Sequence, residues 1–583
     1  MPMRSEEEHL ILVSKGLPVA SIILSADAPD AVVRHARFLQ STLRRMTGAT
    51  LPMRDDSRQW RGAIIDFTGT DNSLQDYGIR IDDHKVTLTG DAGYATCDLL
   101  QQLGCGWFAP DPLYHVIPEA KTLAVAPLER SESPAFVLRS VWNDFPEAKA
   151  AWRLDGTPVH ASHNYWKIIP PDTYFADHPE YFPLIDGQRR QDRQICLSNP
   201  DVQRITVEKA RAWFVENPDF LTFSLSANDF GGFCECDQCR ELGTNPGSRT
   251  LTYANAVARE LSRSHPEKMV CFLAYWYTFA APPKGAKAEA NVMVMVVNQG
   301  DHAHALEDSR SETNAGWRRN FEAWVATGAK MAIYEWYIPG TWSQPWRRLP
   351  WISIDTAYRN LRYWRRHGVQ WITYESQPAY EDGSGYPRRW PLYYVVAQGM
   401  WNPDADPQQV LRNACDTLYG PSGEVMFNYF KALDQAMTQT RLEGSIWDLP
   451  PAESVFGDDV IATVRSLLHE AIQAAKDDRE AYQRVAIEVA LWHESEETLR
   501  SVTPGNRNKV DARDYNGGVW YSDQAETTGR ELRELVGIGS GEPIHVVTSD
   551  GTTRLMADDE AYPLVGGVRV VSAAPAKDSS RHQ

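Results

Sequence analysis

The sequence predicts an α/β protein centred on a (β/α)8 barrel of the TIM type. Apolar runs alternate with helical segments through the middle of the chain, which indicates βαβ units and a parallel sheet. Polar or aromatic residues of catalytic type follow nearly every run, and long amphipathic helices dominate after Trp390. We therefore expect an N-terminal α+β domain (1–130), a catalytic barrel (131–400), a mostly helical region (401–510) and a C-terminal mixed or β segment with a tail (511–583).

The N-terminal part has the pattern of a separate sheet-and-helix domain without a catalytic role. Residues 30–46 have the periodicity of an amphipathic helix, and Thr47-Gly48 form a common helix stop. A second helix is expected at 93–103. Strands are expected at 9–13, 21–25, 63–68 and 77–89, the last with a break at an Asp-Asp pair.

The barrel is predicted from six apolar runs of strand length. They are residues 136–141, 221–225, 269–274, 292–297, 331–334 and 371–374, separated by helices at 200–216, 251–264, 315–326 and 354–366. A closed barrel of this type has eight strands. The other two are expected between Val141 and Leu221, where 182–185 and 194–197 are the candidates.

Beyond the barrel we expect helices, then strands. The helices are predicted at 405–419, 423–439, 458–475 and 479–500, and the strands at 545–549, 553–556 and 565–571.

The composition excludes several kinds of partner. The 583 residues are 43% hydrophobic and 23% charged, an ordinary globular balance. A net charge of −18 argues against nucleic acid and anionic membranes. No apolar run reaches the length of about 18 residues that a membrane helix needs. Residues 1–8 show no signal peptide, so a cytoplasmic protein and a secreted or periplasmic one that has lost its signal both fit. A homodimer is also compatible with the sequence.

Aromatic residues indicate a carbohydrate partner. The chain has 20 Trp and 24 Tyr, some clustered as Tyr275-Trp276-Tyr277 and Tyr334-Glu335-Trp336-Tyr337. Such rings stack on the apolar faces of sugars, although aromatic residues also fill ordinary cores.

The strand ends supply candidate catalytic residues. Leu221–Leu225 is followed by Ser226-Ala227-Asn228-Asp229, and residues just past the carboxyl end of a barrel strand lie where the chemistry is done. Asp229 has the placement of a catalytic carboxylate, unless Asn228-Asp229 only begin the loop. The other runs are followed by Asn143-Asp144, Tyr275-Trp276-Tyr277, Asn298 to His302, Glu335-Trp336 and Glu375-Ser376.

Several motifs resemble a known bacterial family. They are H-P-E-Y-F from His178, the pair Asn199-Pro200, S-A-N-D-F-G-G-F-C-E-C-D-Q-C, Y-A-N-A-V-A, L-A-Y-W-Y-T and W-N-P-D-A-D-P. Over residues 21–439 they resemble the uncharacterised family called domain of unknown function 4838. That family looks related to barrel glycoside hydrolases, chiefly α-glucuronidases and more distantly β-hexosaminidases. The resemblance implies an N-terminal α+β domain, a barrel and a helical C-terminal region.

The resemblance also implies roles for strand-end residues. In α-glucuronidases an A-D-S-E-like strand end carries the general acid, and Ser226-Ala227-Asn228-Asp229 is similar, with Asp in place of Glu. Their base side uses an N-G-P-like and a Q-E-Y-like strand end. Asn298-Gln299-Gly300-Asp301 and Tyr334-Glu335-Trp336-Tyr337 look like the counterparts, although the loop after Asn298 does not match closely.

The predicted function is a glycoside hydrolase, exo-acting because long loops and aromatic residues could close a pocket. Cleavage of a glycosidic bond needs an acid and a second carboxylate. We assign Asp229 as the acid, with its pKa raised by burial, Glu335 as base or nucleophile, Asp301 as a second base and Glu375 as an orienting or sugar-binding group. Asp301 and Glu375 could equally be loop-start residues. A non-catalytic carbohydrate-binding protein on a glycosidase scaffold is the alternative.

Further residues are expected to contact the sugar. They are Asn228, His163, Arg139, Tyr275, Trp276, Trp336 and Asn298. His160 and His163 could instead ligate a metal as an i, i+3 pair. Arg139 could instead form a buried structural ion pair.

A cysteine cluster suggests a structural metal. No cofactor is required by the predicted reaction, and no P-loop or G-x-G-x-x-G context appears. Cys234-x-Cys236-x-x-Cys239 could bind structural zinc if Cys271 or a His supplied a fourth ligand. Reduced thiols or a disulfide are the alternatives, and a metalloenzyme centred on these cysteines is a third hypothesis for the function.

Overall fold

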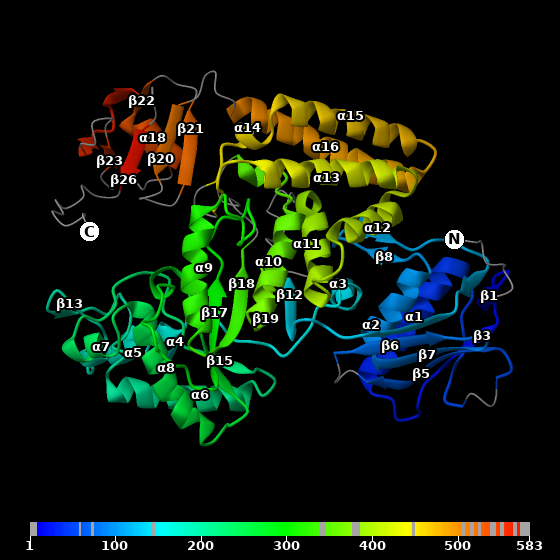
Figure 1. Ribbon diagram of the computed structural model, residues 1–583, viewed down its shortest axis with the longest axis horizontal. Helices are drawn as coiled ribbons and strands as arrows, with labels where there is room; N and C mark the ends of the chain where they lie inside the picture. Colours follow the sequence, from blue (N-terminus) through cyan, green and yellow to red (C-terminus); the bar gives the residue numbers. More distant parts are fainter. Residues whose placement is uncertain are drawn as a thin grey trace.

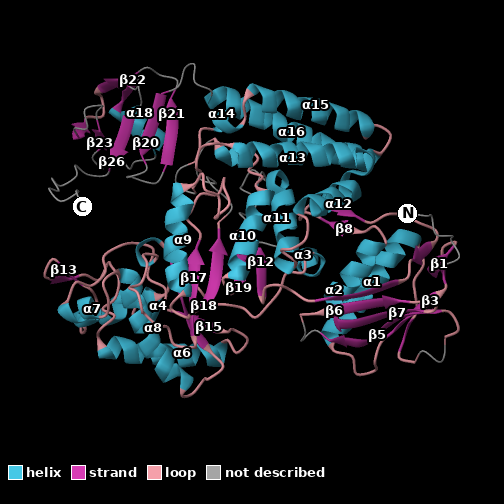
Figure 2. Cartoon of the chain, in the orientation of Figure 1, coloured by secondary structure: helices cyan, strands magenta, loops and turns pink. Residues whose placement is uncertain are grey.

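The computed structural model describes residues 9–56, 60–71, 75–141, 146–336, 345–375, 385–445, 449–502, 508–512, 518–522, 526–536, 544–547, 553–563 and 568–571. These residues form a mixed α/β structure with two larger sheets, a layer of helices and a smaller C-terminal sheet (Figures 1 and 2). The predicted pair Asn143-Asp144 lies outside the described residues.

The N-terminal part is an α+β unit with one six-stranded sheet. Its order is β11-β6-β7-β5-β3-β4, and α1 and α2 pack beside it (Figure 1). The predicted helix stop is confirmed, because Gly48 ends α1 in the left-handed conformation, with φ +80°. The strands are β3 (Ala20–Ile23), β4 (Met53–Arg54), β5 (Ala63–Asp71), β6 (Tyr77–Ile81), β7 (Lys85–Asp91) and β11 (Leu128–Glu132), and the helices are α1 (Asp30–Thr47) and α2 (Ala92–Gln102). Smaller sheets pair β10 (Leu123–Val125), β1 (Leu10–Ser14) and β2 (Leu17–Pro18), and β8 (Gly106–Trp107) with β9 (His115–Val116).

The central sheet contains the six predicted barrel strands, all parallel. Its order is β12-β19-β18-β17-β16-β15. The strands from β15 to β19 each pair with the next one along the chain, and β12, the first in sequence, pairs with the last, β19. The bounds are β12 (Leu138–Val141), β15 (Thr222–Ser224), β16 (Met269–Ala274), β17 (Val292–Val297), β18 (Lys330–Glu335) and β19 (Val369–Tyr374). Buried Val, Ile and Met on both faces explain why these strands read as continuous apolar runs.

The sheet is a curled part-barrel, which corrects the prediction of eight strands. The two extra strands do not occur in the described chain: 184–185 forms the hairpin strand β13 (Leu184–Ile185) with β14 (Gln188–Arg189), and 194–197 is not a strand. Residues 155–164 run between the sheet's two edges instead. They pair with β12 at Arg139–Asp155 and beside β15 at His163–Ser226.

Two residues of this connecting segment disfavour a regular strand. Gly156 has φ +135°, and a side chain there would lie 2.2 Å from the carbonyl oxygen of Val137. Pro158 has no N–H to donate to a ladder. Val159 and Ala161 nevertheless pack with the apolar residues on the inner face of the sheet. The segment therefore completes part of the wall without regular hydrogen bonding.

Helices surround the central sheet and then form a separate layer. The helices on the barrel side are α3 (Pro146–Ala151), α4 (Tyr165–Ile168), α5 (Pro171–Tyr174), α6 (Pro200–Glu216), α7 (Asp237–Glu241), α8 (Pro246–Ser262), α9 (Glu312–Val325), α10 (Ile354–Arg366) and α11 (Gly385–Trp401). The layer, at the top of Figure 1, contains α12 (Pro407–Tyr419), α13 (Gly423–Gln439), α14 (Ala452–Val455), α15 (Asp458–Ala474) and α16 (Arg479–Val502). The four long helices predicted after residue 400 are thus confirmed.

The described end of the chain forms a small sheet. Its order is β21-β20-β26-β23-β24. The elements are β20 (Asn508–Ala512), β21 (Gly518–Ser522), β22 (Glu526–Thr528), α18 (Gly529–Val536), β23 (Ile544–Val547), β24 (Thr553–Met556), β25 (Ala561–Pro563) and β26 (Val568–Val571), with β22 paired to β25.

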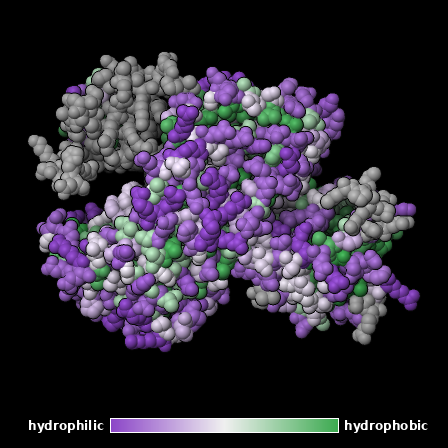
Figure 3. All heavy atoms as spheres, in the orientation of Figure 1, coloured by the Kyte–Doolittle hydropathy of each residue, from purple (hydrophilic) through white to green (hydrophobic). Residues whose placement is uncertain are grey.

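The visible surface is mainly hydrophilic (Figure 3). Hydrophilic residues cover most of the face in Figure 3, and hydrophobic residues show mainly as small groups among them. No described helix has both the length and the apolar character that would let it cross a membrane.

Arg139 connects the N-terminal part to the central sheet, which corrects its predicted contact with substrate. Its side chain is fully buried on the outer face of β12. It donates hydrogen bonds to the Tyr94 hydroxyl (2.9 Å), to Gln75 (2.9 Å) and to the carbonyl oxygens of Arg153 and Phe136 (2.8 and 2.6 Å). Its position therefore fits a structural role, but these acceptors are neutral groups and not the carboxylate of the expected ion pair.

Arg139→Lys tests this role. A lysine keeps the charge but cannot reach four acceptors in different directions. We expect it to lower the free energy of unfolding by roughly 3 kcal/mol, measured by denaturant titration. A loss of sugar binding with unchanged stability would contradict the assignment.

Candidate active site

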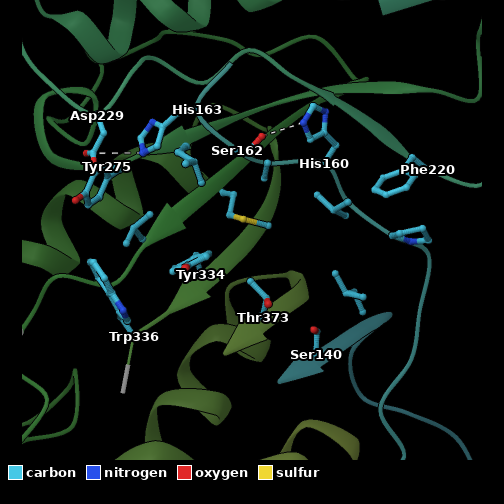
Figure 4. A pocket seen from close by; sticks show the side chains of 17 residues that line it. Ser140, His160, Ser162, His163, Phe220, Asp229, Tyr275, Tyr334, Trp336 and Thr373 are labelled. Atoms are coloured by element: carbon cyan, nitrogen blue, oxygen red, sulfur yellow. Dashed lines mark hydrogen bonds and ion pairs between the residues drawn. The ribbon is translucent and has the colours of Figure 1, made fainter. Parts of the chain in front are cut away.

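A cavity of about 500 Å³ lies on the inner face of the curled sheet (Figure 4). Ser140, Leu273, Met295, Tyr334 and Thr373 line it from five different strands, and residues 158–163 of the connecting segment close another side. Asp229 lies at one end, beside His163 and Tyr275. The cavity thus has an apolar wall with few polar groups, the usual character of a small-molecule site.

Asp229 stands on a loop that is held from outside the sheet. The fully buried Gln194 accepts a hydrogen bond from the Asn228 N–H (2.9 Å) and donates to the carbonyl oxygens of Asn228 (3.0 Å) and Phe230. The Asp229 side chain is 63% exposed, so its predicted burial is not observed. The loop therefore fixes the backbone around Asp229 while leaving the carboxylate open to the cavity.

His163 lies beside Asp229 (Figure 4). Its Nδ1 donates to the Ala227 carbonyl oxygen, and its Nε2 lies 3.7 Å from Asp229 Oδ1. The backbone of His163 is also bridged to Ser226. His163 therefore lines the cavity beside Asp229, and its contact with a substrate stays a prediction.

A second carboxylate, Glu375, is hydrogen-bonded to a residue of the cavity wall. The hydroxyl of Tyr334 donates a 2.6 Å hydrogen bond to Glu375, which follows β19. Burial raises the pKa of Tyr275, and so do the charge and hydrogen bond of Asp229 and the charge of Glu375. Burial and Glu375 likewise raise the pKa of Tyr334. Both phenols are thus protonated at neutral pH.

Aromatic rings surround the mouth. A second cavity of about 210 Å³ shares His163, Asp229 and Tyr275 with the first, and Asn228, Trp276 and Phe230 help to line it. Trp276 is 51% exposed although its backbone has φ +47°, an unfavourable conformation for a bulky residue. The backbone N–H of Trp276 donates to the side-chain oxygen of Gln299 (2.9 Å), which fixes this backbone conformation. Strain of this kind is often found at functional sites.

Glu335 and Asn298 do not reach the cavity, which corrects their predicted roles. In a strand successive side chains alternate between faces. Tyr334 and Trp336 line the cavity, so Glu335 between them points to the outer face. There it is fully buried and accepts hydrogen bonds from Asn298 Nδ2 (2.8 Å) and His302 Nε2 (2.9 Å).

Asp301 also belongs to a buried network outside the cavity, against its predicted role as a base. It accepts hydrogen bonds from His304 Nδ1 (2.6 Å) and from the N–H groups of Ala303 and Gly444 (both 2.9 Å). Burial would raise its pKa, but these hydrogen bonds hold the pKa below the ordinary value. Burial would lower the pKa of His304, but Asp301 and the Thr440 carbonyl oxygen raise it.

His160 is structural in this arrangement. Burial, with a contribution from Lys167, lowers its pKa to about 4, so the ring is neutral at neutral pH. It stacks on Trp213, with ring centroids 4.3 Å apart, and its Nε2 lies 3.0 Å from Ser162 Oγ. It lines the cavity, but no group of described residues that could hold a metal includes His160 or His163.

Two residues of the site were missed from the sequence. Tyr334 could have been found from the sequence, because it lies two positions before Trp336 and therefore on the same face of the strand. Gln194 had none, because its place depends on a loop 34 residues further along the chain.

A family model matches more than half of the chain. The family is described as domain of unknown function (DUF4838), and its model matches residues 109–431. This match confirms the resemblance found in the sequence motifs. No curated protein matched the sequence.

Three solved glycoside hydrolases are among the structures that match this chain. A family GH115 4-O-methyl-alpha-glucuronidase, BtGH115A, with specificity for decorated arabinogalactans, is 12% identical, with a TM-score of 0.50 over 85% of this chain and 76% of that chain. A GH138 enzyme targeting pectin rhamnogalacturonan II is 10% identical (TM-score 0.47, 83% and 69%). A beta-N-acetylhexosaminidase from Bacteroides fragilis NCTC 9343 is 11% identical (TM-score 0.42, 68% and 89%). At 12% identity, the first likeness shows a shared fold.

The Asp301–His304 pair predicts a pH-dependent stability. The lowered pKa of Asp301 contributes stability above its ordinary value of 3.8 and loses it as the pH falls through the lowered pKa. The raised pKa of His304 contributes below its ordinary value of 6.5 and loses it as the pH rises through the raised pKa. We expect His304→Gln to lower the melting temperature most between these two values and less at higher pH. An equal loss at every pH would contradict this.

Proposed function

The chain belongs to the DUF4838 family, and we propose that it is a glycoside hydrolase with its active site in the cavity of the curled sheet. The observation that carries the proposal is a cavity lined by Asp229, Tyr275 and Tyr334, with a second carboxylate, Glu375, hydrogen-bonded to Tyr334. Glycoside cleavage requires two carboxyl groups close to the bound sugar. The fold shared with the GH115 enzyme supports the same class of reaction.

Asp229 acts as the general acid in this proposal. Its carboxyl group is open to the cavity and lies on a loop held by Gln194, so it can reach the leaving-group oxygen without rearranging. His163, at 3.7 Å, can return the proton between turnovers. General acid catalysis of this kind contributes about 10²–10⁴-fold to the rate.

Glu375 acts as the second carboxylate, as nucleophile or base. The short hydrogen bond from Tyr334 favours its ionised form and fixes the position of the attacking oxygen. Glu335 cannot take this role from the outer face of β18. Glu375 thus moves from the orienting role assigned from the sequence to a catalytic one.

The substrate we propose is a neutral sugar, closer to a hexosaminide than to a glucuronide, cleaved from a chain end. A uronic acid carboxylate is normally met by Arg or Lys. No Arg or Lys occurs among the described lining residues of either cavity. The sequences 142–145, 337–344 and 376–384, which follow β12, β18 and β19, contain none either. Trp276 and Phe230 offer rings for stacking at the mouth.

Hydrolysis of aryl glycosides by wild type, Asp229→Asn, Glu375→Gln and Glu335→Gln tests the proposal. The panel should contain neutral hexosides, N-acetylhexosaminides and glucuronides. We expect cleavage of a neutral sugar, reduced by about 10²–10⁴-fold in the first two variants with unchanged melting temperature. Glu335→Gln should instead lower the melting temperature, because it disturbs a buried network, and keep most of the activity of the folded protein.

Two outcomes would overturn the proposal. Sugar binding without any cleavage would favour the non-catalytic carbohydrate-binding alternative. Activity lost in Glu335→Gln at unchanged stability, but kept in Glu375→Gln, would show that Glu335 on β18 is the base or nucleophile.

Trp276 is expected to act in binding. Trp276→Ala should raise KM by about 3–10-fold with little change in kcat, since one stacking contact is worth about 0.5–1.5 kcal/mol. Trp276→Gly is the matched control. It should lose the same affinity but be more stable than the alanine variant, because glycine tolerates φ +47°. A larger effect on kcat than on KM would contradict a binding role.

A further inference from the structure

Four cysteines from two separate segments meet beside the loop that carries Asp229. Cys196 comes before α6, and Cys234, Cys236 and Cys239 come from the loop after β15 and from α7. Their sulfur atoms all lie within 4.8 Å of one another, and three of the four residues are buried. We propose that these cysteines bind one structural zinc ion as a tetrathiolate site.

The spacing of the sulfur atoms fits a tetrahedral metal. With zinc–sulfur bonds of about 2.3 Å, the edges of a sulfur tetrahedron measure about 3.8 Å. The sulfur of Cys196 lies 3.7 Å from Cys234, 3.9 Å from Cys236 and 3.7 Å from Cys239. These distances are far longer than the roughly 2.05 Å of a disulfide bond, and all four thiols are free.

The fourth ligand is the one that the sequence did not identify. Cys271, which the sequence suggested, is buried on the inner face of β16 among apolar side chains. Cys196 takes its place from 38 residues before Cys234. Four thiolates without a carboxylate or imidazole form a soft donor set, which selects zinc or iron over magnesium and calcium.

Neighbouring polar groups are suited to thiolates. The Leu184 N–H donates to the Cys234 sulfur (3.3 Å), and the Ser198 hydroxyl lies 3.1 Å from the Cys239 sulfur and 3.6 Å from that of Cys236. Donors that point at ligand sulfurs offset their negative charge and fix their orientation.

The proposed ion would hold the candidate active site in place, a consequence that rests on the proposed function. Asp229 lies five residues before Cys234, and Gln194, which holds the Asp229 loop, lies two residues before Cys196. The metal would therefore tie the segment that contains Gln194 and Cys196 to the loop that contains Asp229 and Cys234. It would act as a positioning element, because its four ligands leave no open coordination position for substrate.

Metal analysis of the full chain, purified without chelators, tests the site. We expect about one zinc per chain in wild type by inductively coupled plasma mass spectrometry, and near zero in Cys196→Ser and Cys239→Ser. Cys105→Ser is the matched control, since Cys105 is buried in the N-terminal part away from the cluster and should keep the zinc.

Wild type alone gives a second measurement if the variants do not fold. Cobalt-loaded wild type should show the absorption bands of a tetrahedral cobalt thiolate, and a mercurial reagent should release zinc as the thiols are titrated. A metal-free or iron-containing wild type, or full zinc in Cys196→Ser, would overturn the proposal. Zinc without glycoside cleavage would reject only the proposed function, and cleavage without zinc would reject only the metal site.

Discussion

The alternation of side chains along the parallel strands decides which polar residues can take part in catalysis. On β18 the inner face presents Tyr334 and Trp336 to the cavity, so Glu335 must face outwards. The same constraint places Arg139 on the outer face of β12. Residues that a sequence places at one strand end are therefore divided between a reactive cavity and buried structural networks. Of the predicted carboxylates that the structure describes, Asp229 and Glu375 are the two with partners on the cavity side.

The rest of the site depends on segments outside the regular sheet. Residues 155–164 bring His163 beside Ser226 and fill the wall where further strands were predicted. Gln194 fixes the backbone of the Asp229 loop, and the four sulfurs meet just beyond it. Fixing catalytic groups before substrate binds removes part of the entropic cost of reaching the transition state. Irregular segments therefore position the candidate catalytic groups here, as strand ends do in a closed barrel.

Much of the fold could be predicted because its signals are local. The six strands, helix α1 with its Gly48 stop and the long C-terminal helices follow from periodicity and stop residues. The sequence could not show which side chains of each strand point to the cavity. Both faces of β17 are buried and apolar, so hydropathy does not distinguish them. Gln194 and Cys196 act on a loop more than 30 residues away, so their roles depend on tertiary structure alone.

The dependence of the rate on the leaving group tests the central claim most directly, namely that Asp229 donates the proton in a glycoside cleavage. The measurement is kcat/KM of wild type and Asp229→Asn for aryl glycosides of one sugar with leaving groups of increasing basicity. A missing acid matters most when the leaving group is basic. The account predicts a small loss for the most acidic phenol and a loss that grows with basicity. An equal loss for every leaving group, or none, would contradict it.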